Sequence, residues 1–573
     1  MNSNNNVACP LDCFDTCQAK YENGSFKGDK DHFVTNGKLC VNFANLVNEN
    51  YLTTSKYLGK EISLDESLEI LVDKLKNTTL EKTLFYKGSG NLGLMQKSTG
   101  YFFSQYGSTL TKGSLCEAAG EEGIIQGRGK SINPSIENLM NSDVIIVWGR
   151  NFTQTSAHMY NLVKDKTFIT IDPVKTEIAK KSELHLQINP KTDYELALML
   201  TRVAYMNGID DEEYLEENTE GHDWFFDIAK NRPLVSYEEK CGIDLDDVYK
   251  FFDLIENKKV SIMLGVGPQK YNEGVQITRT IDSFATFIGI HKQENAGGVW
   301  YLGTSMYGYD DLFKTKTKNK KVSLPKIDYG KFDLVFIQGA NPVVSSPNTK
   351  KVIEGLKNSF VVYFGITEND TCEYADLIIP SSSFLSKKDI RLSYGHDLKS
   401  ISDVVEEKNP NTITEYELTN FLCKKFDLET LKDEDEIISY YKETKVEKEE
   451  QFEEFEFIED LDVEPLYKNK KDDNFYLITA KNPKSLNSQF AKDDYVYLNS
   501  DSNFNENDEV NISSAYGEAK FVVKINDDIK TGCAFFYAGN KFVNYLTPFE
   551  EDDEAHNAIF QEVLLDIELC WVI

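Results

Sequence analysis

A regular alternation of short apolar runs and helical stretches, from about Asp65 to Phe384, restricts the possible fold more than any other feature of this chain. The apolar runs are rich in β-branched residues and end near a Gly, Asp or Asn. They are DVIIVWG (143–149), TFITIDP (167–173), VSIMLGVG (260–267), DLVFIQGANP (333–342) and SFVVYFGIT (359–367). Amphipathic stretches such as YELALMLTRVAY (194–205) separate them. This order predicts parallel sheets with helices on both faces.

The ends of these predicted strands are the expected place for a ligand, because parallel sheets bind ligands beyond their carboxyl ends. The Gly and Asn residues there are candidates for binding loops. Turn formation at a strand end explains any one of them equally well.

The last third of the chain has a different character. From about Leu428 to Pro465 it is crowded with acidic residues, which predicts a solvated, helix-rich connector, with metal binding by these carboxylates as the alternative. Beyond it lie the short strand-like runs FYLITA (475–480), DYVYLNS (494–500), DEVNISSAYGEAKFVVKI (508–525) and GCAFFYAG (532–539). They predict a compact β-rich domain, a small barrel.

Length and charge set the broad class of protein. The chain has 573 residues, enough for about four domains at ~150 residues each. Its 62 Lys and Arg against 94 Asp and Glu give a net charge of −32, which disfavours nucleic acid and anionic membranes as partners. Neither a signal sequence in MNSNNNVACP nor an apolar run of ~20 residues is present. We therefore expect a cytoplasmic protein with no direct membrane insertion.

Four cysteines near the start, Cys9, Cys13, Cys17 and Cys40, have the spacing C-x3-C-x3-C-x22-C. Three close thiols with a fourth further along favour a [4Fe-4S] cluster. A structural zinc site and disulfides are the alternatives, but zinc sites use paired C-x2-4-C knuckles, and disulfides need a secretory context. The loop of radical enzymes also uses three close cysteines, yet it needs no fourth thiolate such as Cys40.

The segment GSGNLG (88–93) matches G-x-G-x-x-G, follows the strand-like TLFYK and precedes the helix-like LMQKSTGYFFSQYG. This is the context in which a dinucleotide pyrophosphate binds a helix N-terminus. The acidic residue expected about 20 positions later, for the ribose hydroxyl, is missing before Glu117. An NAD-dependent dehydrogenase that uses the GSGNLG loop therefore remains an alternative function, although its motif is incomplete.

Segments in a fixed order along nearly the whole chain carry a resemblance to a known family. They are CPLDCFDTC, NGKLC, SLDESLEILVDKL, GSLCEAAGEEG, VIIVWGRN, ITIDPVKTEIAKKSELHLQINPKTD, FIQGANPVVSSP, YADLIIPSSSFL and LITAKNPKSLNSQF. On them the chain resembles the molybdopterin bis-guanine-dinucleotide oxidoreductases, the superfamily of dimethyl sulfoxide reductase and formate dehydrogenase. The resemblance implies a multidomain α/β fold: an N-terminal iron–sulfur domain, two α/β domains with largely parallel sheets and a C-terminal β-barrel domain.

The resemblance and the composition together predict the domain boundaries. We expect an iron–sulfur domain at 1–55, a discontinuous α/β domain at 56–112 and 310–427, a nucleotide-binding-like α/β domain at 113–309, an acidic connector at 428–470 and a molybdopterin-dinucleotide-binding barrel at 471–573.

The resemblance also implies a molybdenum or tungsten centre held by two copies of molybdopterin guanine dinucleotide and one protein side chain. Cys116 in SLCEAAG occupies the matching place, and a soft thiolate at a helix start is a suitable donor. A buried cysteine that packs a helix start is the alternative. Glu117 stands where formate-oxidising members have His, and it is a candidate catalytic base or a helix cap.

The remaining predicted contacts hold the two nucleotide tails and the pterins. Asp172 is the expected acceptor for a guanine edge, and Gly residues allow close approach of the backbone. By resemblance the contacts are Gly149, Asn151, Asp172, Thr176, Pro190, Thr192, Asp193, Gly265, Gly267, Gly339, Asn341, Thr479, Lys481, Ser488 and Asn544. Arg150 and Arg391 are candidates for binding a diphosphate or an anionic substrate.

The implied function is two-electron redox chemistry at the metal, with single electrons passing through the cluster to a ferredoxin-like or other electron-transfer protein. The substrate is formate, a small oxyanion, or an N- or S-oxide. Family members often carry a Lys two residues after the fourth cluster cysteine, where this chain has Asn42; Lys38 is a possible substitute. A pterin-free electron-relay subunit of a respiratory complex is the second alternative to this function.

Overall fold

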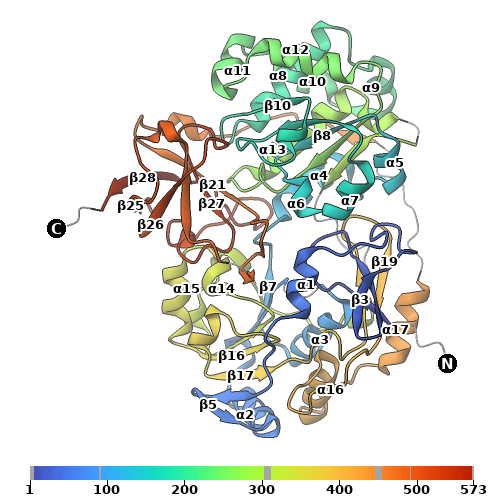
Figure 1. Cartoon of the computed structure of the whole chain (residues 1–573), viewed down its shortest axis with the longest axis vertical. Coiled ribbons are helices and arrows are strands. Elements are labelled where there is room, and N and C mark those ends of the chain that lie inside the picture. The colour runs from blue at the N-terminus through green and yellow to red at the C-terminus, as the bar shows by residue number, and fades with distance from the viewer. Residues whose placement is uncertain are drawn as a thin grey trace.

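The computed structural model describes residues 5–89, 92–293, 295–301, 311–444, 454–490 and 492–570. Figure 1 shows two α/β bodies, one above the other. A β-barrel lies at one side of their junction, and a small N-terminal domain lies at the other. Within the described part of the chain, no helix has both the length and the apolar character needed to cross a membrane.

The upper α/β body contains a five-stranded sheet in which all neighbouring strands are parallel. Its strands, in spatial order, are β10 (Leu184–Leu186), β9 (Thr167–Ile171), β8 (Val144–Trp148), β12 (Val260–Leu264) and β13 (Gly298–Tyr301). Ile146 of β8 packs in the core with α8 and α13, whereas its neighbour Ile145 packs on the other face with α7. Both faces are therefore covered, which explains why these strands are apolar throughout.

Ten helices of the described chain belong to this upper body. They are α4 (Ala118–Arg128), α5 (Ile136–Asn141), α6 (Phe152–Thr155), α7 (Ala157–Val163), α8 (Asp193–Met206), α9 (Glu212–Asn218), α10 (His222–Lys230), α11 (Leu234–Cys241), α12 (Leu245–Ile255) and α13 (Gly274–Phe287).

The lower α/β body contains a six-stranded sheet assembled from distant parts of the chain. In spatial order its strands are β5 (Lys60–Ile62), β4 (Ser55–Tyr57), β17 (Leu377–Pro380), β16 (Phe360–Gly365), β15 (Leu334–Gln338) and β6 (Thr83–Lys87). The last four strands run parallel, and β4 and β5 add an antiparallel edge. Its helices are α2 (Leu64–Asn77), α3 (Ser98–Tyr106), α14 (Pro342–Ser345), α15 (Thr349–Leu356), α16 (Glu415–Lys425) and α17 (Glu434–Glu443).

Local sequence explains where several helices of the lower body begin. Ser63 and Glu66 form a reciprocal capping box at the start of α2, and Thr414 and Glu417 do the same for α16. Each box satisfies backbone N–H groups that have no partner inside the helix.

The C-terminal domain is a closed barrel, as predicted. Its strands, in order around the barrel, are β21 (Phe475–Ala480), β27 (Cys533–Tyr537), β24 (Tyr495–Leu498), β26 (Glu518–Ile525), β25 (Glu509–Ser513) and β28 (Leu564–Leu569). Leu477, Val496 and Val523 belong to its buried core. With the two parallel sheets, this confirms the predicted multidomain α/β fold with a C-terminal barrel. The domain boundaries stay predictions.

The N-terminal domain consists of a three-stranded sheet and one helix. The strands are β1 (Asn6–Ala8), β2 (Gln18–Glu22) and β3 (Ser25–Gly28), and α1 (Val41–Val47) follows. The hairpin of β18 (Asp389–Leu392) and β19 (Lys399–Ser402) packs against it. That this domain holds an iron–sulfur cluster remains a proposal.

The acidic segment before the barrel is not solvated throughout. Its last part forms β20 (Phe455–Glu456), which pairs with β11 (Thr219–Glu220). The rings of Phe455 and Phe457 are fully buried in the core of the upper body. Alternation of Phe with Glu in this stretch therefore marks a strand with one buried face.

Candidate active site

A cavity of about 1860 Å³ is lined by both α/β bodies, the barrel and the N-terminal loop. It is larger than the ~300–1,000 Å³ of ordinary small-molecule sites. Gly149, Asp172 and Gly265 line it just beyond β8, β9 and β12 of the upper sheet. Gly339 lines it just beyond β15 of the lower sheet. The carboxyl ends of both parallel sheets therefore face one space, as expected for ligand binding in such folds.

The cavity brings together all but one of the residues predicted to contact the pterins or the heavy metal. The exception is Thr192, which is buried and donates its hydroxyl hydrogen bond to the Asn189 carbonyl at 2.7 Å. The four predicted cluster cysteines lie outside the cavity lining. The predicted residues that line the cavity are Cys116, Glu117, Gly149, Asn151, Asp172, Thr176, Pro190, Asp193, Gly265, Gly267, Gly339, Asn341, Thr479, Lys481, Ser488 and Asn544.

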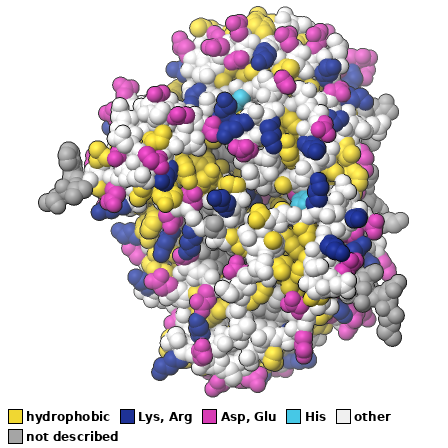
Figure 2. Space-filling view, viewed as in Figure 1, with side chains coloured by type: hydrophobic (Ala, Val, Ile, Leu, Met, Phe, Trp, Pro, Cys, Tyr) yellow, Lys and Arg dark blue, Asp and Glu magenta, His cyan; other side chains and the backbone are white. Residues whose placement is uncertain are grey.

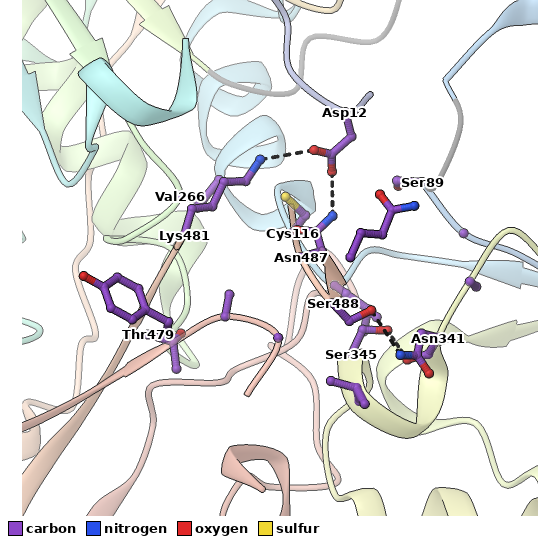
Figure 3. A pocket seen from close by; sticks show the side chains of 18 of the residues that line it. Asp12, Ser89, Cys116, Val266, Asn341, Ser345, Thr479, Lys481, Asn487 and Ser488 are labelled. Atoms are coloured by element: carbon purple, nitrogen blue, oxygen red, sulfur yellow. Dashed lines mark hydrogen bonds and ion pairs between the residues drawn. The ribbon is translucent and has the colours of Figure 1, made fainter. Parts of the chain in front are cut away.

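Cys116 lies just before α4 and is exposed to the cavity. Its backbone N–H donates to the Ser114 hydroxyl at 2.8 Å. Surrounding protein and the Glu117 carboxylate raise the pKa of the thiol, and the charges of Lys270 and Lys481 oppose this. The thiolate would therefore need a further positive charge, such as a metal ion, for full stabilisation. Figure 3 shows the sulfur in the cavity, near the pair formed by Asp12 and Lys481.

Lys481 links the barrel to the N-terminal loop. Its ammonium lies 3.2 Å from Asp12 Oδ1, and the Asn487 amide donates to Asp12 Oδ2 at 3.0 Å (Figure 3). Burial alone would lower the pKa of Lys481, but the charges of Asp12 and Cys116 raise it. Lys481 therefore stays charged beside Cys116.

Sequence reasoning missed three polar residues of this centre: Asp12, Lys270 and Asn487. Lys270 follows directly after the predicted glycine loop LGVGPQ, and Asp12 lies inside the cysteine loop, so position offered a signal for both. Asn487 lies next to the predicted contact Ser488 in the segment LITAKNPKSLNSQF, so position offered a signal for it as well. Several Lys and Arg side chains lie over the middle of the face shown in Figure 2, although the chain as a whole is strongly acidic.

Glu117 is fixed next to Cys116 by local contacts. Ser114 donates to its carboxylate at 3.1 Å, and the Tyr301 hydroxyl donates to its backbone carbonyl at 2.8 Å. Burial raises the pKa of the Glu117 carboxyl. The residue occupies the N-cap position of α4, but its side chain makes no capping hydrogen bond. Glu117 therefore stands at the cap position that the alternative predicted, but its carboxylate takes no part in capping.

Two carboxyl groups of the upper body are prepared for a ligand that donates hydrogen bonds. Burial raises the pKa of Asp172 to about 7 and that of Asp193 to about 6. Asp172 accepts from the Val174 N–H at 2.8 Å, and Asp193 accepts from the Trp148 indole at 2.8 Å. A ligand that offers N–H groups, as a guanine edge does, would stabilise the ionised form of Asp172.

The glycines of the site serve two different purposes. A Cβ on Gly265 would lie 2.1 Å from the Gly149 carbonyl oxygen, so this glycine is required for packing between neighbouring loops. Gly339 has φ +54°, and nothing lies within 4 Å of the place where its Cβ would be. Gly265 therefore packs against protein, whereas Gly339 leaves open space at the cavity. Such space allows a cofactor to approach the backbone closely.

The two candidate arginines lie in different places. Arg150 lines the cavity, donates to the Ser156 hydroxyl at 2.7 Å and stacks on Phe14 with 4.6 Å to the ring centroid. Burial lowers its pKa to about 10, so it remains charged at neutral pH. Arg391 is buried away from the cavity lining and contacts the N-terminal cysteine loop.

The four N-terminal cysteines are free thiols gathered around one loop. The Cys9 N–H donates to the Cys17 carbonyl at 2.9 Å, which closes this loop. Burial and the charge of Cys40 raise the pKa of Cys9 to about 12. Burial, Asp15 and the other cysteines raise the pKa values of Cys13 and Cys17. Cys9 and Cys17 are buried, Cys13 and Cys40 are half-buried, and no disulfide joins them. Four free thiols around one loop would fit the iron atoms of a cluster.

A second ligand set shares one of these cysteines. Asp15, Cys17 and His158 place their donor atoms within 4.8 Å of one another. The His158 Nδ1 lies 3.3 Å from Cys17 Sγ and 3.2 Å from Asp15 Oδ2. This set would suit a single ion, so the zinc alternative keeps a structural basis.

The glycine motif at 88–93 does not present a free helix start. Gly90 and Asn91 lie outside the described residues. The turn of 3-10 helix that follows, Leu94–Lys97, receives the chain's own carboxylate, because the Met95 N–H donates to Asp389 at 2.9 Å. A pyrophosphate would have to displace this carboxylate, which disfavours the NAD alternative.

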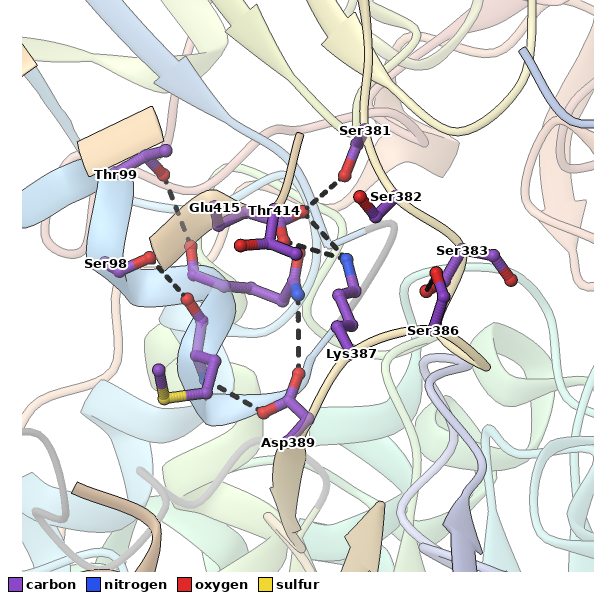
Figure 4. Close-up of polar contacts among 12 residues, drawn as sticks. Ser98, Thr99, Ser381, Ser382, Ser383, Ser386, Lys387, Asp389, Thr414 and Glu415 are labelled. Atoms are coloured by element: carbon purple, nitrogen blue, oxygen red, sulfur yellow. Dashed lines mark hydrogen bonds and ion pairs between the residues drawn. The ribbon is translucent and has the colours of Figure 1, made fainter. Parts of the chain in front are cut away.

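A buried ion pair supports the wall of the cavity next to the lower sheet. Figure 4 shows the Lys387 ammonium pointing to the Glu415 carboxylate, which also accepts from Ser381. The Lys387 to Glu415 distance is 2.8 Å, and the two side chains are 3% and 5% exposed.

Replacement of Lys387 by Met leaves the Glu415 carboxylate buried without its partner. We expect the free energy of unfolding to fall by about 3–5 kcal/mol, measured by chemical denaturation of the purified protein. The neighbouring Lys388 makes an exposed pair with Asp435, so Lys388→Met should cost about 1 kcal/mol or less. Equal losses in the two variants would contradict a supporting role for the buried pair.

Comparison with known proteins places the chain in a family. The family model for molybdopterin oxidoreductase matches residues 60–421. The probable oxidoreductase YoaE of Bacillus subtilis is 26% identical over 477 residues, which cover 75% of this chain and 70% of YoaE. The F420-dependent formate dehydrogenase 2 subunit alpha of Methanococcus maripaludis is 25% identical over 412 residues, covering 62% of this chain and 60% of that subunit.

Two further comparisons concern a more distant relative and the fold. The nitrate reductase of Shewanella frigidimarina is 24% identical over 421 residues, covering 63% of this chain and 44% of the relative. The solved structure of acetylene hydratase from Pelobacter acetylenicus shares the fold, with a TM-score of 0.80 at 15% identity over 99% of this chain and 100% of that one. The resemblance seen in the sequence is confirmed. The chain belongs to the molybdopterin oxidoreductase family.

Proposed function

We propose that this chain is a molybdenum or tungsten oxidoreductase that binds two molybdopterin guanine dinucleotides and passes electrons through an N-terminal [4Fe-4S] cluster. Family membership supports molybdopterin-dependent redox chemistry. The observation that carries the finer proposal is the meeting of both sets of strand ends at one large cavity, with the Cys116 thiol open to it.

The residues of the cavity fit such a cofactor. Gly339 leaves room for a group at the backbone, Asp172 offers a carboxyl to a guanine edge, and Arg150 offers a positive charge to a diphosphate. Cys116 is the candidate protein ligand to the metal. When bound, the metal and its pterins would supply two-electron redox chemistry, and the protein would supply orientation and electrostatics.

The charge of Lys270 near Cys116 favours a small anionic substrate. Lys481 also acts on this thiol and lines the cavity, but it is paired with Asp12, so Lys270 is the candidate cation for a bound anion. Glu117, fixed by Ser114, is the candidate proton acceptor next to them. Formate and small oxyanions such as nitrate match this arrangement, and similar relatives include a formate dehydrogenase subunit and a nitrate reductase.

Removal of the Lys270 charge should weaken substrate binding. A charge-assisted hydrogen bond contributes about 1.5–3 kcal/mol, so Lys270→Met should raise KM about 10- to 100-fold with formate or nitrate and a viologen dye. Lys524→Met, which removes a charge paired with Glu506 on the barrel surface, is the matched control. An unchanged KM in Lys270→Met would argue against an anionic substrate at this position.

Electron partner and location follow from the same proposal. Cys13 and Cys40 are only half-buried, and the next residue, Val41, is 61% exposed, so a cluster here would lie near the surface. We propose a ferredoxin-like or other electron-transfer protein as the partner, and the cytoplasm as the location.

Elemental analysis of protein purified without oxygen tests the proposal, combined with pterin fluorescence after acid release. We expect iron, molybdenum or tungsten, and released pterin. Iron without either heavy metal would instead support an electron-relay subunit. Tight NADH binding without pterin would support a dehydrogenase.

A further inference from the structure

The hairpin β18–β19 holds the cysteine loop through an uninterrupted series of hydrogen bonds. Each backbone carbonyl from Leu11 to Thr16 accepts one from a side chain between residues 391 and 400. The pairs are Arg391 with Leu11 (3.4 Å) and Cys13 (3.1 Å), Tyr394 with Asp12 (3.0 Å), Ser393 with Phe14 (2.7 Å), His396 with Asp15 (3.3 Å) and Ser400 with Thr16 (2.6 Å).

The protonation of His396 is fixed in a way that suits this role. Burial lowers its pKa to about 4, so the ring is neutral near pH 7. The Leu398 N–H donates to Nδ1 at 3.2 Å, which leaves the proton on Nε2, the atom that faces the Asp15 carbonyl. All six carbonyls therefore face the hairpin and its donors.

The opposite side of a peptide group carries its N–H. With their carbonyls held by the hairpin, the peptide units of this loop are oriented so that N–H groups are available to the thiols. The hydrogen bond of the Leu11 N–H with the Cys9 thiol is one such case. N–H donors to cluster sulfurs are among the factors that set a cluster's reduction potential.

Arg391 is the only permanently charged donor in this series. Its side chain is about 1% exposed, and its acceptors are the carbonyls of Leu11, Cys13, Leu92 and Leu392. Among the residues that the structure describes, no carboxylate forms an ion pair with it. Arg128, equally buried, is paired with Asp282.

A buried cation without a counter-ion costs several kcal/mol. The hydrogen bonds to the Leu11 and Cys13 carbonyls place the Arg391 charge directly beside the loop that carries three of the predicted cluster ligands. An iron–sulfur cluster with four thiolate ligands is an anion, and it gains one more negative charge when it is reduced. Such a cluster would supply the counter-charge that the chain itself does not provide for Arg391.

We propose that the hairpin forms the second wall of the cluster site, and that Arg391 is the counter-cation of the cluster and raises its reduction potential. The proposal rests on the cluster of the proposed function. Arg391 is a positioning residue: it favours the reduced cluster electrostatically, because the added electron enters beside a fixed positive charge. The guanidinium stays protonated, so no proton transfer accompanies the electron.

The test uses the full-length holoprotein, purified without oxygen and titrated with dithionite while the reduced cluster is followed by EPR. In Arg391→Gln we expect the equilibrium between reduced and oxidised cluster to shift at least tenfold toward oxidised, a fall in potential of about 59 mV or more. Arg391→Lys keeps the charge and should restore most of the potential. Tyr394→Phe removes an uncharged donor to the same loop and should shift the equilibrium much less.

Each outcome decides the matter. An iron-loaded Arg391→Gln protein with unchanged potential overturns the proposal, as does an equal shift in Tyr394→Phe. Arg391→Gln could also fail to retain iron. In that case, an iron-loaded Arg391→Lys protein with a nearly normal potential supports the proposal. Loss of iron from both variants overturns it, because the geometry of the loop would then matter and the charge would not. Absence of iron from the unmodified protein would defeat the proposed function itself, so the two failures are distinct.

Discussion

Replacement of Cys116 by Ala should abolish turnover while leaving the fold and the iron content unchanged. The thiol is the one predicted protein ligand to the heavy metal, and it lies open to the cavity rather than in a hydrophobic core. Loss of residues that only support a metal ligand costs about 10–100-fold, so loss of the ligand should cost more than ~100-fold in activity. Viologen-coupled assays with formate and nitrate measure this, and EPR of the heavy metal reports the changed coordination.

Cys570→Ala is the matched control for this experiment. Cys570 is half-buried just after β28 of the barrel, and its backbone N–H bonds to the Glu509 carbonyl independently of the side chain. The control should keep its activity and its EPR spectrum. Full activity in Cys116→Ala would show that the thiol only packs the start of α4.

The second large effect is expected from Cys17→Ala. Cys17 is buried at the closure of the cysteine loop, where its carbonyl accepts from the Cys9 N–H. Removal of one of four thiolates should lower the affinity for the cluster by more than ~100-fold, with loss of iron and of the broad visible absorbance. Iron analysis and absorbance spectra of protein purified without oxygen measure both.

Cys241→Ala separates the loss of a ligand from the loss of a buried sulfur atom. Cys241 is fully buried in the core of the upper body, far along the chain from the predicted cluster ligands. Its replacement should lower stability through a small cavity, with iron content unchanged. Equal iron content in the two variants would mean that Cys17 is not a cluster ligand, and it would revive the single-ion site with Asp15 and His158.

Much of the site could be predicted from the sequence because parallel strands impose a common direction. Gly149, Asp172 and Gly339 each follow an apolar run, and the ends of parallel strands meet at one edge of a sheet. The repeated order of strands and helices in the sequence therefore predicted where the cavity lies. The barrel was predictable for a similar reason, since short strands separated by turn residues have few other solutions.

Other features depend on contacts that no local pattern encodes. The donors to the cysteine loop, such as Ser393 and Tyr394, lie about 380 positions away from their acceptors and form no motif. Thr192 was expected to face a pterin, but its hydroxyl is used to bond the Asn189 carbonyl at the start of α8. The burial of Phe455 was not predicted, because the acidic residues around it give the segment a polar average composition. Such an average does not reveal a strand with only one buried face.

The bridge between Asp12 and Lys481 has a consequence for how the enzyme is assembled. It joins the cysteine loop to the barrel domain, 469 positions later, beside Cys116. The walls of the cavity are therefore incomplete until the barrel has been synthesised and has docked. A ligand too large to enter the complete cavity must bind before the ion pair between Asp12 and Lys481 forms, or this ion pair must break to admit it.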